Sequence, residues 1–194
     1  MADYETRRFS RAEYDKLIDL GVFQPGEAIE LLGGHLVVAE PQGAAHYTAI
    51  VKTARALQAA FGAAWYVRTQ GPIGLDDESE REPDAAAVPG SVEDYGRAHP
   101  SRVVLIVEVA EASLAIDRQH KGSLYARAGL PDYWIVNLVD RVLEVYRDPG
   151  ADVAAPYGWR YLSAERLTPP ASVSPIGVQA ASIPVAALLP GAGT

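Results

Sequence analysis

Two acidic residues of the chain stand where apolar stretches begin or end. Asp84 follows Pro83 and opens the apolar stretch 85–88, and Glu108 comes directly after the continuous aliphatic run 103–107. Such a run is typical of a central strand that is covered on both faces of its sheet. An ionised carboxylate at the end of a buried strand is destabilising unless a cation or hydrogen-bond donors compensate its charge. Both carboxylates therefore require a partner.

A shared cation would be such a partner. If the strands that carry Asp84 and Glu108 are neighbours, both carboxylates lie at the same end of the sheet and repel each other unless a cation lies between them. Magnesium suits this arrangement, because it takes one or two carboxylates and completes its octahedron with carbonyls, waters and substrate phosphate oxygens. Lys121 lies about one turn into the next predicted helix and adds an amine. Two carboxylates and an amine near one point are the groups that a metal-dependent phosphodiester hydrolase needs.

Length and composition predict a single domain. The 194 residues, 48% of them apolar, suffice for one substantial core and are too few for two ordinary domains with a linker. We expect one domain over residues 1–194, in which segment 151–194 is an irregular extension packed on the core, with edge strands and one short helix. No apolar run reaches the roughly 18 residues of a membrane span, and no basic-then-apolar leader opens the chain. We therefore expect a cytoplasmic protein without a membrane partner.

The absence of cysteine and the negative net charge limit the kinds of site that the chain can form. The chain contains no cysteine, which excludes disulfides, thiolate metal sites and cysteine nucleophiles. Its formal net charge is −8, whereas nonspecific affinity for nucleic acid comes mostly from lysine and arginine. Binding of DNA would therefore need a local basic strip, a dimer cleft or the bound metal.

Turn residues and hydrophobic spacing predict the elements around these groups. A capping box formed by Ser10 and Glu13 opens a helix that Gly21 ends. Apolar residues at helical spacing predict a second helix over 44–61, and the glycine pair 33–34 predicts a two-residue hairpin. The other expected elements are strands at 65–69, 72–75, 85–88 and 103–109, a solvated loop at 76–80, a helix at 117–128, and a hairpin of strands 133–136 and 142–146.

This order of elements carries a family resemblance. Its most specific pieces are Glu82-Pro83-Asp84, the strand end Glu108-Val109, and the helix from Asp117-Arg118 through Lys121 to segment 125–129. In these pieces, and in the order of elements over nearly the whole chain, the sequence resembles the Uma-two family, restriction-endonuclease-like domains of the PD-(D/E)XK nuclease superfamily. The resemblance implies an α/β restriction-endonuclease-like fold with a mixed central sheet flanked by helices. It also implies that Asp84 and Glu108 bind the metal, that Val109 contributes a carbonyl ligand, and that Glu30 is an auxiliary acid.

The lysine of the superfamily normally lies two residues after the second acid, but this chain has Ala110 there. The resemblance places the amine on the following helix, at Lys121. Asp117, Lys121 and Tyr125 are spaced four apart and share one helix face. The amine would deprotonate or orient the attacking water, or stabilise charge in the transition state. The alternative is an ordinary surface pair of Asp117 with Lys121.

The function expected from these residues is metal-dependent endonucleolytic hydrolysis of phosphodiester bonds. The expected substrate is nucleic acid, in particular DNA, and the expected cofactor is Mg²⁺, with Mn²⁺ as the alternative metal. The superfamily is compatible with a homodimer. A catalytically silent nuclease-fold domain that acts as a binding or regulatory module is the alternative function, and a hydrolase of small phosphoesters is a third. The sequence leaves the roles of His46, Gln70 and Asp117 open.

Overall fold

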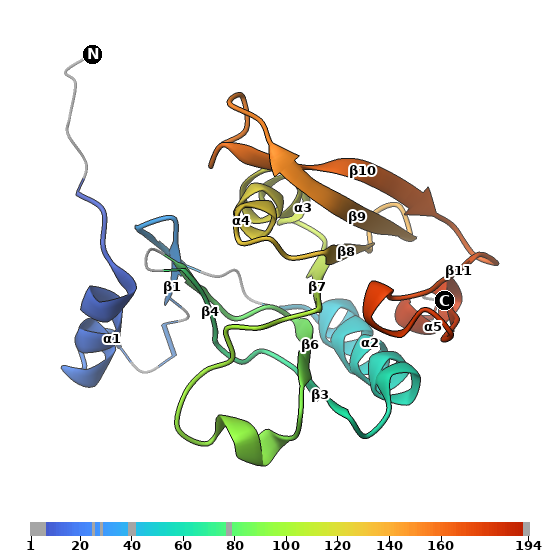
Figure 1. Cartoon of the computed structure of the whole chain (residues 1–194), viewed down its shortest axis with the longest axis horizontal. Helices are drawn as coiled ribbons and strands as arrows, with labels where there is room; N and C mark the ends of the chain where they lie inside the picture. The colour runs from blue at the N-terminus through green and yellow to red at the C-terminus, as the bar shows by residue number, and fades with distance from the viewer. Residues whose placement is uncertain (1–6, 25, 28, 39–41, 77–78, 192–194) are drawn as a thin grey trace.

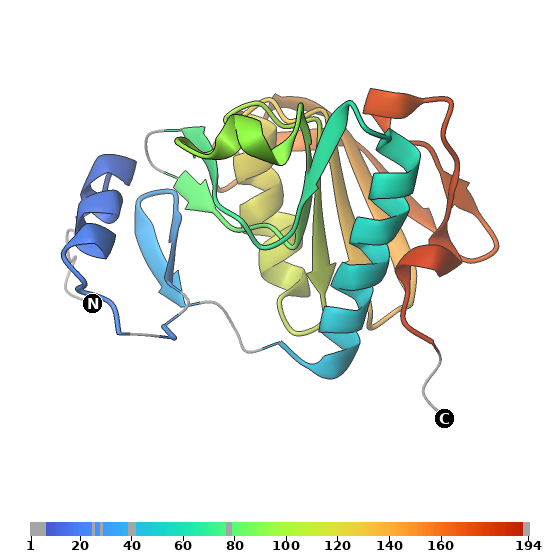
Figure 2. The same ribbon diagram turned by 90° about the horizontal axis from the view of Figure 1, so that it is seen from below.

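The computed structural model describes residues 7–24, 26–27, 29–38, 42–76 and 79–191. Within these residues, six strands form a mixed central sheet: β3 (Trp65–Arg68), β6 (Ala85–Pro89), β7 (Leu105–Ala110), β8 (Asp132–Asn137), β9 (Val142–Ala151) and β10 (Trp159–Leu167). Their order across the sheet is β10-β9-β8-β7-β6-β3. Helix α2 (Ala44–Phe61) covers one face and helix α4 (Gly122–Arg127) covers the other (Figure 2). The predicted α/β fold is therefore confirmed.

A smaller sheet lies beside the central one. The strands described in it are β1 (Ile29–Leu32), β2 (His35–Val38), β4 (Ile73–Asp76) and β5 (Ser79–Arg81), in the order β2-β1-β5-β4. The predicted hairpin forms between β1 and β2, with Leu32 opposite His35 and with Gly33 and Gly34 at φ values of 55° and 79°. Helix α1 (Arg11–Asp19) lies next to this sheet, at the end of the molecule opposite the C-terminal segment (Figure 1).

The N-terminal helix begins where its sequence predicts. The Ser10 hydroxyl accepts a hydrogen bond from the Glu13 backbone N–H over 3.3 Å, and the Ser10 N–H donates to Oε2 of Glu13 over 3.0 Å. This reciprocal capping box satisfies two N–H groups that otherwise lack a partner at a helix start. Gly21, at φ 64°, follows the last turn.

The acidic run 76–80 is not a continuous loop, contrary to the sequence prediction. Asp76 ends β4, and Ser79–Arg81 form β5, which pairs antiparallel with both β4 and β1. Asp77 and Glu78 lie outside the described residues. A three-residue strand has too few positions to show an alternating pattern, and its identity depends on a partner strand far away in the sequence.

The two acids of the sequence prediction stand opposite each other at one end of the central sheet. Strands β6 and β7 pair antiparallel, with Ala85 opposite Val107 and Ala86 opposite Ile106. One further step along this register places Asp84 opposite Glu108. Residues that face each other across an antiparallel pair lie about 5 Å apart at Cα, so the topology brings the acids together as predicted.

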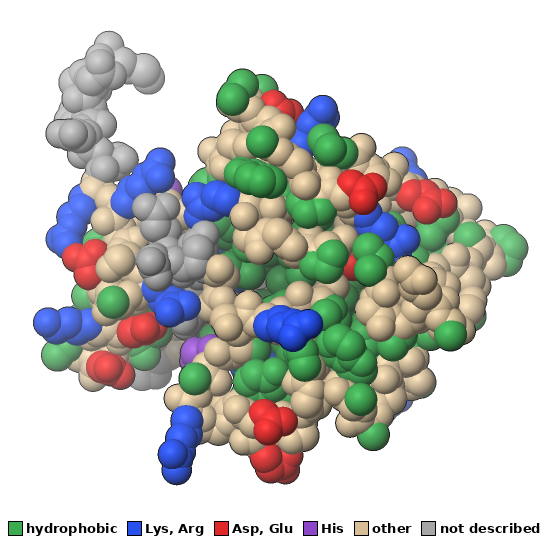
Figure 3. Space-filling model, viewed as in Figure 1, with side chains coloured by type: hydrophobic (Ala, Val, Ile, Leu, Met, Phe, Trp, Pro, Cys, Tyr) green, Lys and Arg blue, Asp and Glu red, His purple; other side chains and the backbone are tan. Residues whose placement is uncertain are grey.

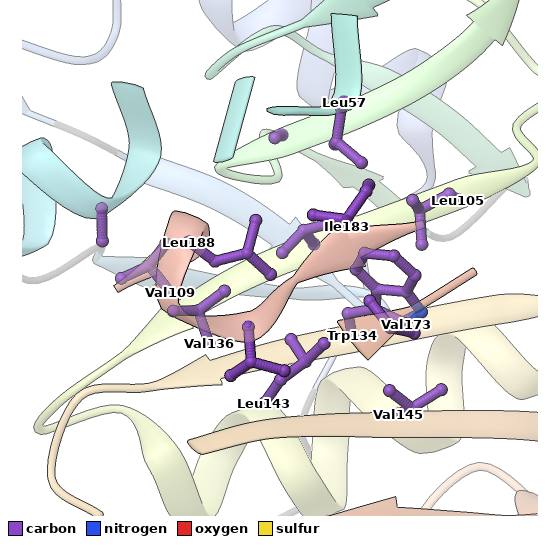
Figure 4. Packing of buried hydrophobic residues seen from close by; sticks show 14 of the residues in the cluster. Leu57, Leu105, Val109, Trp134, Val136, Leu143, Val145, Val173, Ile183 and Leu188 are labelled. Atoms are coloured by element: carbon purple, nitrogen blue, oxygen red, sulfur yellow. The ribbon is translucent and has the colours of Figure 1, made fainter. Parts of the chain in front are cut away.

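Side chains alternate between the two faces of β7. Val107 and Val109 pack in the hydrophobic cluster under α2, whereas Ile106 packs in the cluster under α4. By the same alternation, Glu108 belongs to the α4 face. Figure 4 shows the cluster on the α2 face, where Leu57 and side chains of the sheet meet the C-terminal segment. The strand end that carries Glu108 is thus fixed by packing on both faces.

The helix after β7 begins about one turn earlier than predicted and is interrupted. It consists of α3 (Leu114–Ile116), a π-helical turn η2 (Asp117–Lys121) and α4. The Asp117 N–H already donates to the carbonyl of Ser113 over 3.0 Å. Gly129, at φ 72°, follows the helix.

The C-terminal segment completes both the sheet and the α2 face. Strand β10 pairs with β9 along its length and forms the edge of the central sheet. A short pair of strands, β11 (Ser172–Val173) and β12 (Ile183–Pro184), leads to helix α5 (Val185–Leu188), which packs against α2. Two short 3₁₀ turns, η1 (Val92–Tyr95) and η3 (Ile176–Val178), lie in the connections. Within the described residues, no helix is long and apolar enough to cross a membrane.

Candidate active site

A cavity of about 210 Å³ opens at the end of β7 where Glu108 lies. Hairpin β1–β2, the start of α2, the segment before β6, the end of β7 and the helix after it contribute to its lining. All of the predicted site residues line this cavity: Glu30, Asp84, Glu108, Val109 and Lys121. His46 lines it as well, whereas Gln70 does not; the backbone N–H of Gln70 donates to the carbonyl of Pro83 over 3.1 Å.

Asp84 is held at the sheet end by the backbone of β7. Its Oδ2 atom accepts a hydrogen bond from the Val109 N–H over 2.8 Å, and the residue is 7% exposed. The N–H and C=O of one strand residue point to the same side of the strand, so the Val109 carbonyl also faces the Asp84 side. Consistently, the next carbonyl, that of Ala110, turns the other way and accepts from the N–H of Leu138 over 2.9 Å.

Glu108 is buried and bound at both of its oxygens. The Tyr125 hydroxyl donates to Oε1 over 2.6 Å, and Nζ of Lys121 lies 3.0 Å from Oε2. Burial raises the pKa of Glu108 to about 7; Lys121 opposes this rise, while Asp117 and Asp84 add to it. The carboxyl group thus lies in an environment where a cation strongly favours its ionised form.

Lys121 bridges two carboxylates of the site. Its Nζ atom lies 2.6 Å from Oδ1 of Asp117 in addition to the contact with Glu108. Burial lowers the pKa of Lys121, but the charges of Glu108 and Asp117 outweigh this effect and raise it overall. The Ser113 hydroxyl donates to the other oxygen of Asp117 over 2.6 Å. The exposed fraction of Asp117 is 0%, so its contact with Lys121 is not an ordinary surface ion pair.

Arg81 is a buried residue of the site that the sequence analysis did not predict. Arg81 of β5 forms an ion pair with Glu30 of β1, lines the cavity and is 4% exposed. Burial lowers the pKa of Arg81, but Glu30, Tyr125 and Glu108 together raise it more, so the guanidinium stays charged. The only sequence signal is its position beside the motif at Glu82, because its partner strand β1 lies far away in the chain.

His46 contacts Asp84 from the α2 side. Its Nε2 atom lies 3.2 Å from Oδ2 of Asp84. Burial lowers the pKa of His46, but the contact with Asp84 and the charges of Glu108 and Asp117 raise it overall. The contact with Asp84 therefore favours the protonated form of the imidazole.

The donor set suits a hard divalent cation. Within the described residues, no group of three or more His, Asp or Glu side chains is placed to hold a metal ion. Two carboxylates and one backbone carbonyl remain, which are oxygen ligands of the kind that Mg²⁺ and Mn²⁺ take together with waters. Carboxylates outnumber cationic groups in the lining of the cavity: Glu30, Glu82, Asp84, Glu108 and Glu111 stand against Arg81, Lys121 and His46. A bound divalent cation would offset part of this negative charge.

Comparison with known sequences identifies the family. Residues 11–185 match the profile of the Uma2 family, described as "Putative restriction endonuclease". The chain belongs to the Uma2 family. This is the Uma-two family that its motifs resemble, and the match confirms the resemblance over most of the chain. No curated protein matches the Uma2 chain significantly.

A solved structure shares the fold of this Uma2 protein. It is the crystal structure of a "putative nuclease belonging to DUF820" from Anabaena variabilis ATCC 29413. The TM-score is 0.64 at 14% sequence identity, and the match covers 88% of this chain and 94% of the other. At this identity the likeness concerns the fold alone.

Proposed function

We propose that this Uma2 protein is a metal-dependent nuclease that hydrolyses phosphodiester bonds in DNA. The observation that carries the proposal is that the carboxylates of Asp84 and Glu108 and the amine of Lys121 line one cavity at the end of β7. Fold alone does not determine function, so the argument depends on this cavity and its chemistry. Membership of a nuclease family supports nucleic acid as the substrate class.

Asp84, Glu108 and the carbonyl of Val109 would hold the cation, Mg²⁺ or Mn²⁺. When bound, such an ion polarises the scissile phosphate and lowers the pKa of a coordinated water. Lys121 orients the attacking water or stabilises the charge that develops on the phosphate oxygens. The water oxygen forms a new bond to phosphorus, one phosphorus–oxygen ester bond breaks, and the leaving oxygen takes up a proton. The products are a phosphate monoester and an alcohol.

Arg81 is placed to bind substrate phosphate. It lines the cavity as a permanently charged group, and its ion pair with Glu30 fixes it from the side of β1. Arginine recognises phosphate oxygens through a planar fork of N–H donors. In this assignment Glu30 acts through Arg81 and through the charge of the site.

With a net charge of −8, contact with the DNA backbone would depend on local groups of lysine and arginine. Lys and Arg side chains gather around α1 in Figure 3, interspersed with acidic ones. The segment before α1 lies against the hairpin that walls the cavity, since the Phe9 N–H donates to the carbonyl of Gly34 over 2.9 Å. Contacts between such residues and phosphates are sequence-independent and weaken with salt.

One observation favours a second candidate, a catalytically silent binding domain. Lys121 and Arg81 already neutralise Glu108 and Glu30 by direct ion pairs, so the site is partly compensated without a metal. A cleavage assay decides between the two functions. Double-stranded, single-stranded and branched DNA are incubated with Mg²⁺, with Mn²⁺ or with chelator, using Asp84→Asn as the inactive control. Metal-dependent cleavage by wild type but not by Asp84→Asn supports the nuclease. If neither protein cleaves DNA under any of these conditions, the silent domain is supported.

A further inference from the structure

The π-helical turn η2 lies at the active site. The N–H of Gly122 donates to the carbonyl of Asp117, five residues earlier, in place of the usual α-helical bond. The Tyr133 hydroxyl donates to the same carbonyl over 3.1 Å. Turns of this kind are rare within α-helices and frequently lie at functional sites, which raises the question of what this one positions.

The turn directs its charged side chains to different strands. Arg118 reaches Glu144 of β9, with 2.9 Å between Nε and Oε2. Lys121 reaches Glu108 of β7, and Asp117 is fully buried beneath the turn. The wider turn thus aims Lys121 at the cavity while Asp117 remains beside it.

Asp117 is fixed on both of its oxygens, and one of them holds the lysine. Its Oδ1 atom lies 2.6 Å from Nζ of Lys121, and its Oδ2 atom accepts the hydrogen bond from Ser113. A lysine side chain has a flexible four-carbon stem and loses considerable rotamer freedom when it is held in one place. A second carboxylate contact beside Glu108 removes that freedom. Within the described residues, Asp117 does not line the cavity. It therefore acts through Lys121 and does not touch a substrate.

We propose that Asp117 is a positioning residue that holds the Lys121 ammonium group at the cavity beside Glu108, and that Ser113 orients Asp117 for this task. The inference rests on the proposed nuclease function only where it concerns turnover. The π-helical turn is the device that allows a buried Asp117 and a cavity-facing Lys121 to remain in contact.

The position of the ammonium group can be measured without any cleavage assay. The lysines of the chain are Lys16, Lys52 and Lys121, so a protein labelled with ¹⁵N at lysine side chains gives few ammonium signals, and Lys121→Arg assigns the relevant one. We expect an ordered, slowly exchanging Lys121 ammonium signal in wild type. Asp117→Asn should broaden it or move it to the position of a solvated lysine, and Ser113→Ala should cause a smaller change in the same direction. Gln119→Ala, at an exposed position of the same turn, is the matched control and should change nothing.

Kinetics provide the second readout. Asp117→Asn should lower kcat by about ten-fold or more, as expected for the loss of a charge-assisted hydrogen bond, and leave KM and magnesium affinity within about two-fold. Ser113→Ala, which keeps the carboxylate, should lower kcat less and provides the test if Asp117→Asn fails to fold. An unchanged Lys121 signal in the folded variants, or a loss confined to KM, would overturn the proposal. If wild type cleaves no DNA with either metal, the proposed function fails, while the ammonium signal still decides whether Asp117 positions Lys121.

Discussion

Tyr125 donates its hydroxyl hydrogen to Oε1 of Glu108 over 2.6 Å, and both residues are buried. Burial, and then the charge of Glu108, raise the pKa of Tyr125 well above its usual value, so the hydroxyl remains a donor. Lys121 occupies the other oxygen of Glu108. The carboxylate therefore has a fixed orientation at the end of β7, set by two residues of the following helix.

Tyr125→Phe should lower the free energy of unfolding by about 2 kcal/mol, because it removes a hydrogen bond to a buried carboxylate while the ring keeps its packing. Urea denaturation of both proteins at neutral pH measures the difference. Tyr47→Phe, at a position that is 59% exposed, is the matched control and should leave the denaturation midpoint unchanged. Coincident curves for Tyr125→Phe and wild type would show that the hydrogen bond does not contribute net stability.

Metal binding and catalysis should separate between Glu108 and Lys121. Lys121→Ala should leave magnesium affinity near that of wild type yet lower turnover by roughly a hundred-fold or more, the loss typical of a general acid-base group. Glu108→Gln should lose both. Because an ion that binds only the folded state raises the melting temperature by mass action, magnesium should stabilise wild type and Lys121→Ala but not Glu108→Gln.

Thermal melts with and without magnesium, beside a cleavage assay, test this separation. Equal turnover in Lys121→Ala and wild type would remove the lysine from the mechanism. If wild type itself does not respond to magnesium, the silent binding domain becomes the better assignment.

Acid should destabilise the protein partly through Glu144. Burial raises the pKa of this carboxyl group, but hydrogen bonds from Arg118, Asn137 and Tyr146 outweigh it and lower the pKa from 4.5 to about 2. A depressed folded-state pKa means that the stabilisation is fully present above about pH 4.5 and is lost as the pH falls towards 2. We expect about 2 kcal/mol, allowing for solvent screening at the partly exposed Arg118.

Urea denaturation at several pH values between 2 and 5 measures that loss. Glu144→Gln should show a shallower decline over this range than wild type. Glu165→Gln removes the same charge from an exposed side chain of β10 and serves as the control for net charge. Identical slopes in wild type and Glu144→Gln would assign the acid sensitivity to other groups.

Local signals predicted most of the fold. The capping box at Ser10 and the glycine pair at Gly33 act within a few residues, so their geometry follows from the sequence and is confirmed. The position of Asp84 opposite Glu108 followed from the apolar pattern once their strands were taken as neighbours. The roles of these acids as metal ligands remain predictions, and the cleavage and melting experiments test them.

What the sequence missed depends on contacts between distant segments. Arg81 lies in a strand of three residues whose partner, Glu30, belongs to another hairpin. The burial of Asp117 depends on the π-helical turn, which leaves no periodic pattern in the sequence. From the sequence alone, an ordinary surface ion pair of Asp117 with Lys121 was therefore a reasonable alternative. Tertiary packing determines the burial of both Arg81 and Asp117. Local sequence propensity does not predict it.

The last prediction concerns the hairpin that walls the cavity. A Cβ atom at Gly33 would lie 2.3 Å from Cε1 of Tyr157, and the glycine has a φ of 55°. Gly21 has a similar φ of 64° with no atom within 4 Å of such a Cβ. Gly21→Ala should therefore lower the free energy of unfolding by about 1–2 kcal/mol, the penalty of the left-handed conformation alone. Gly33→Ala should lower it by measurably more.

Removal of the Tyr157 ring separates the clash from the backbone penalty. In a Tyr157→Ala background, Gly33→Ala should lower the free energy of unfolding only as much as Gly21→Ala does. Urea denaturation of this double-mutant cycle measures the coupling, and additive costs would show that Tyr157 does not constrain the hairpin turn.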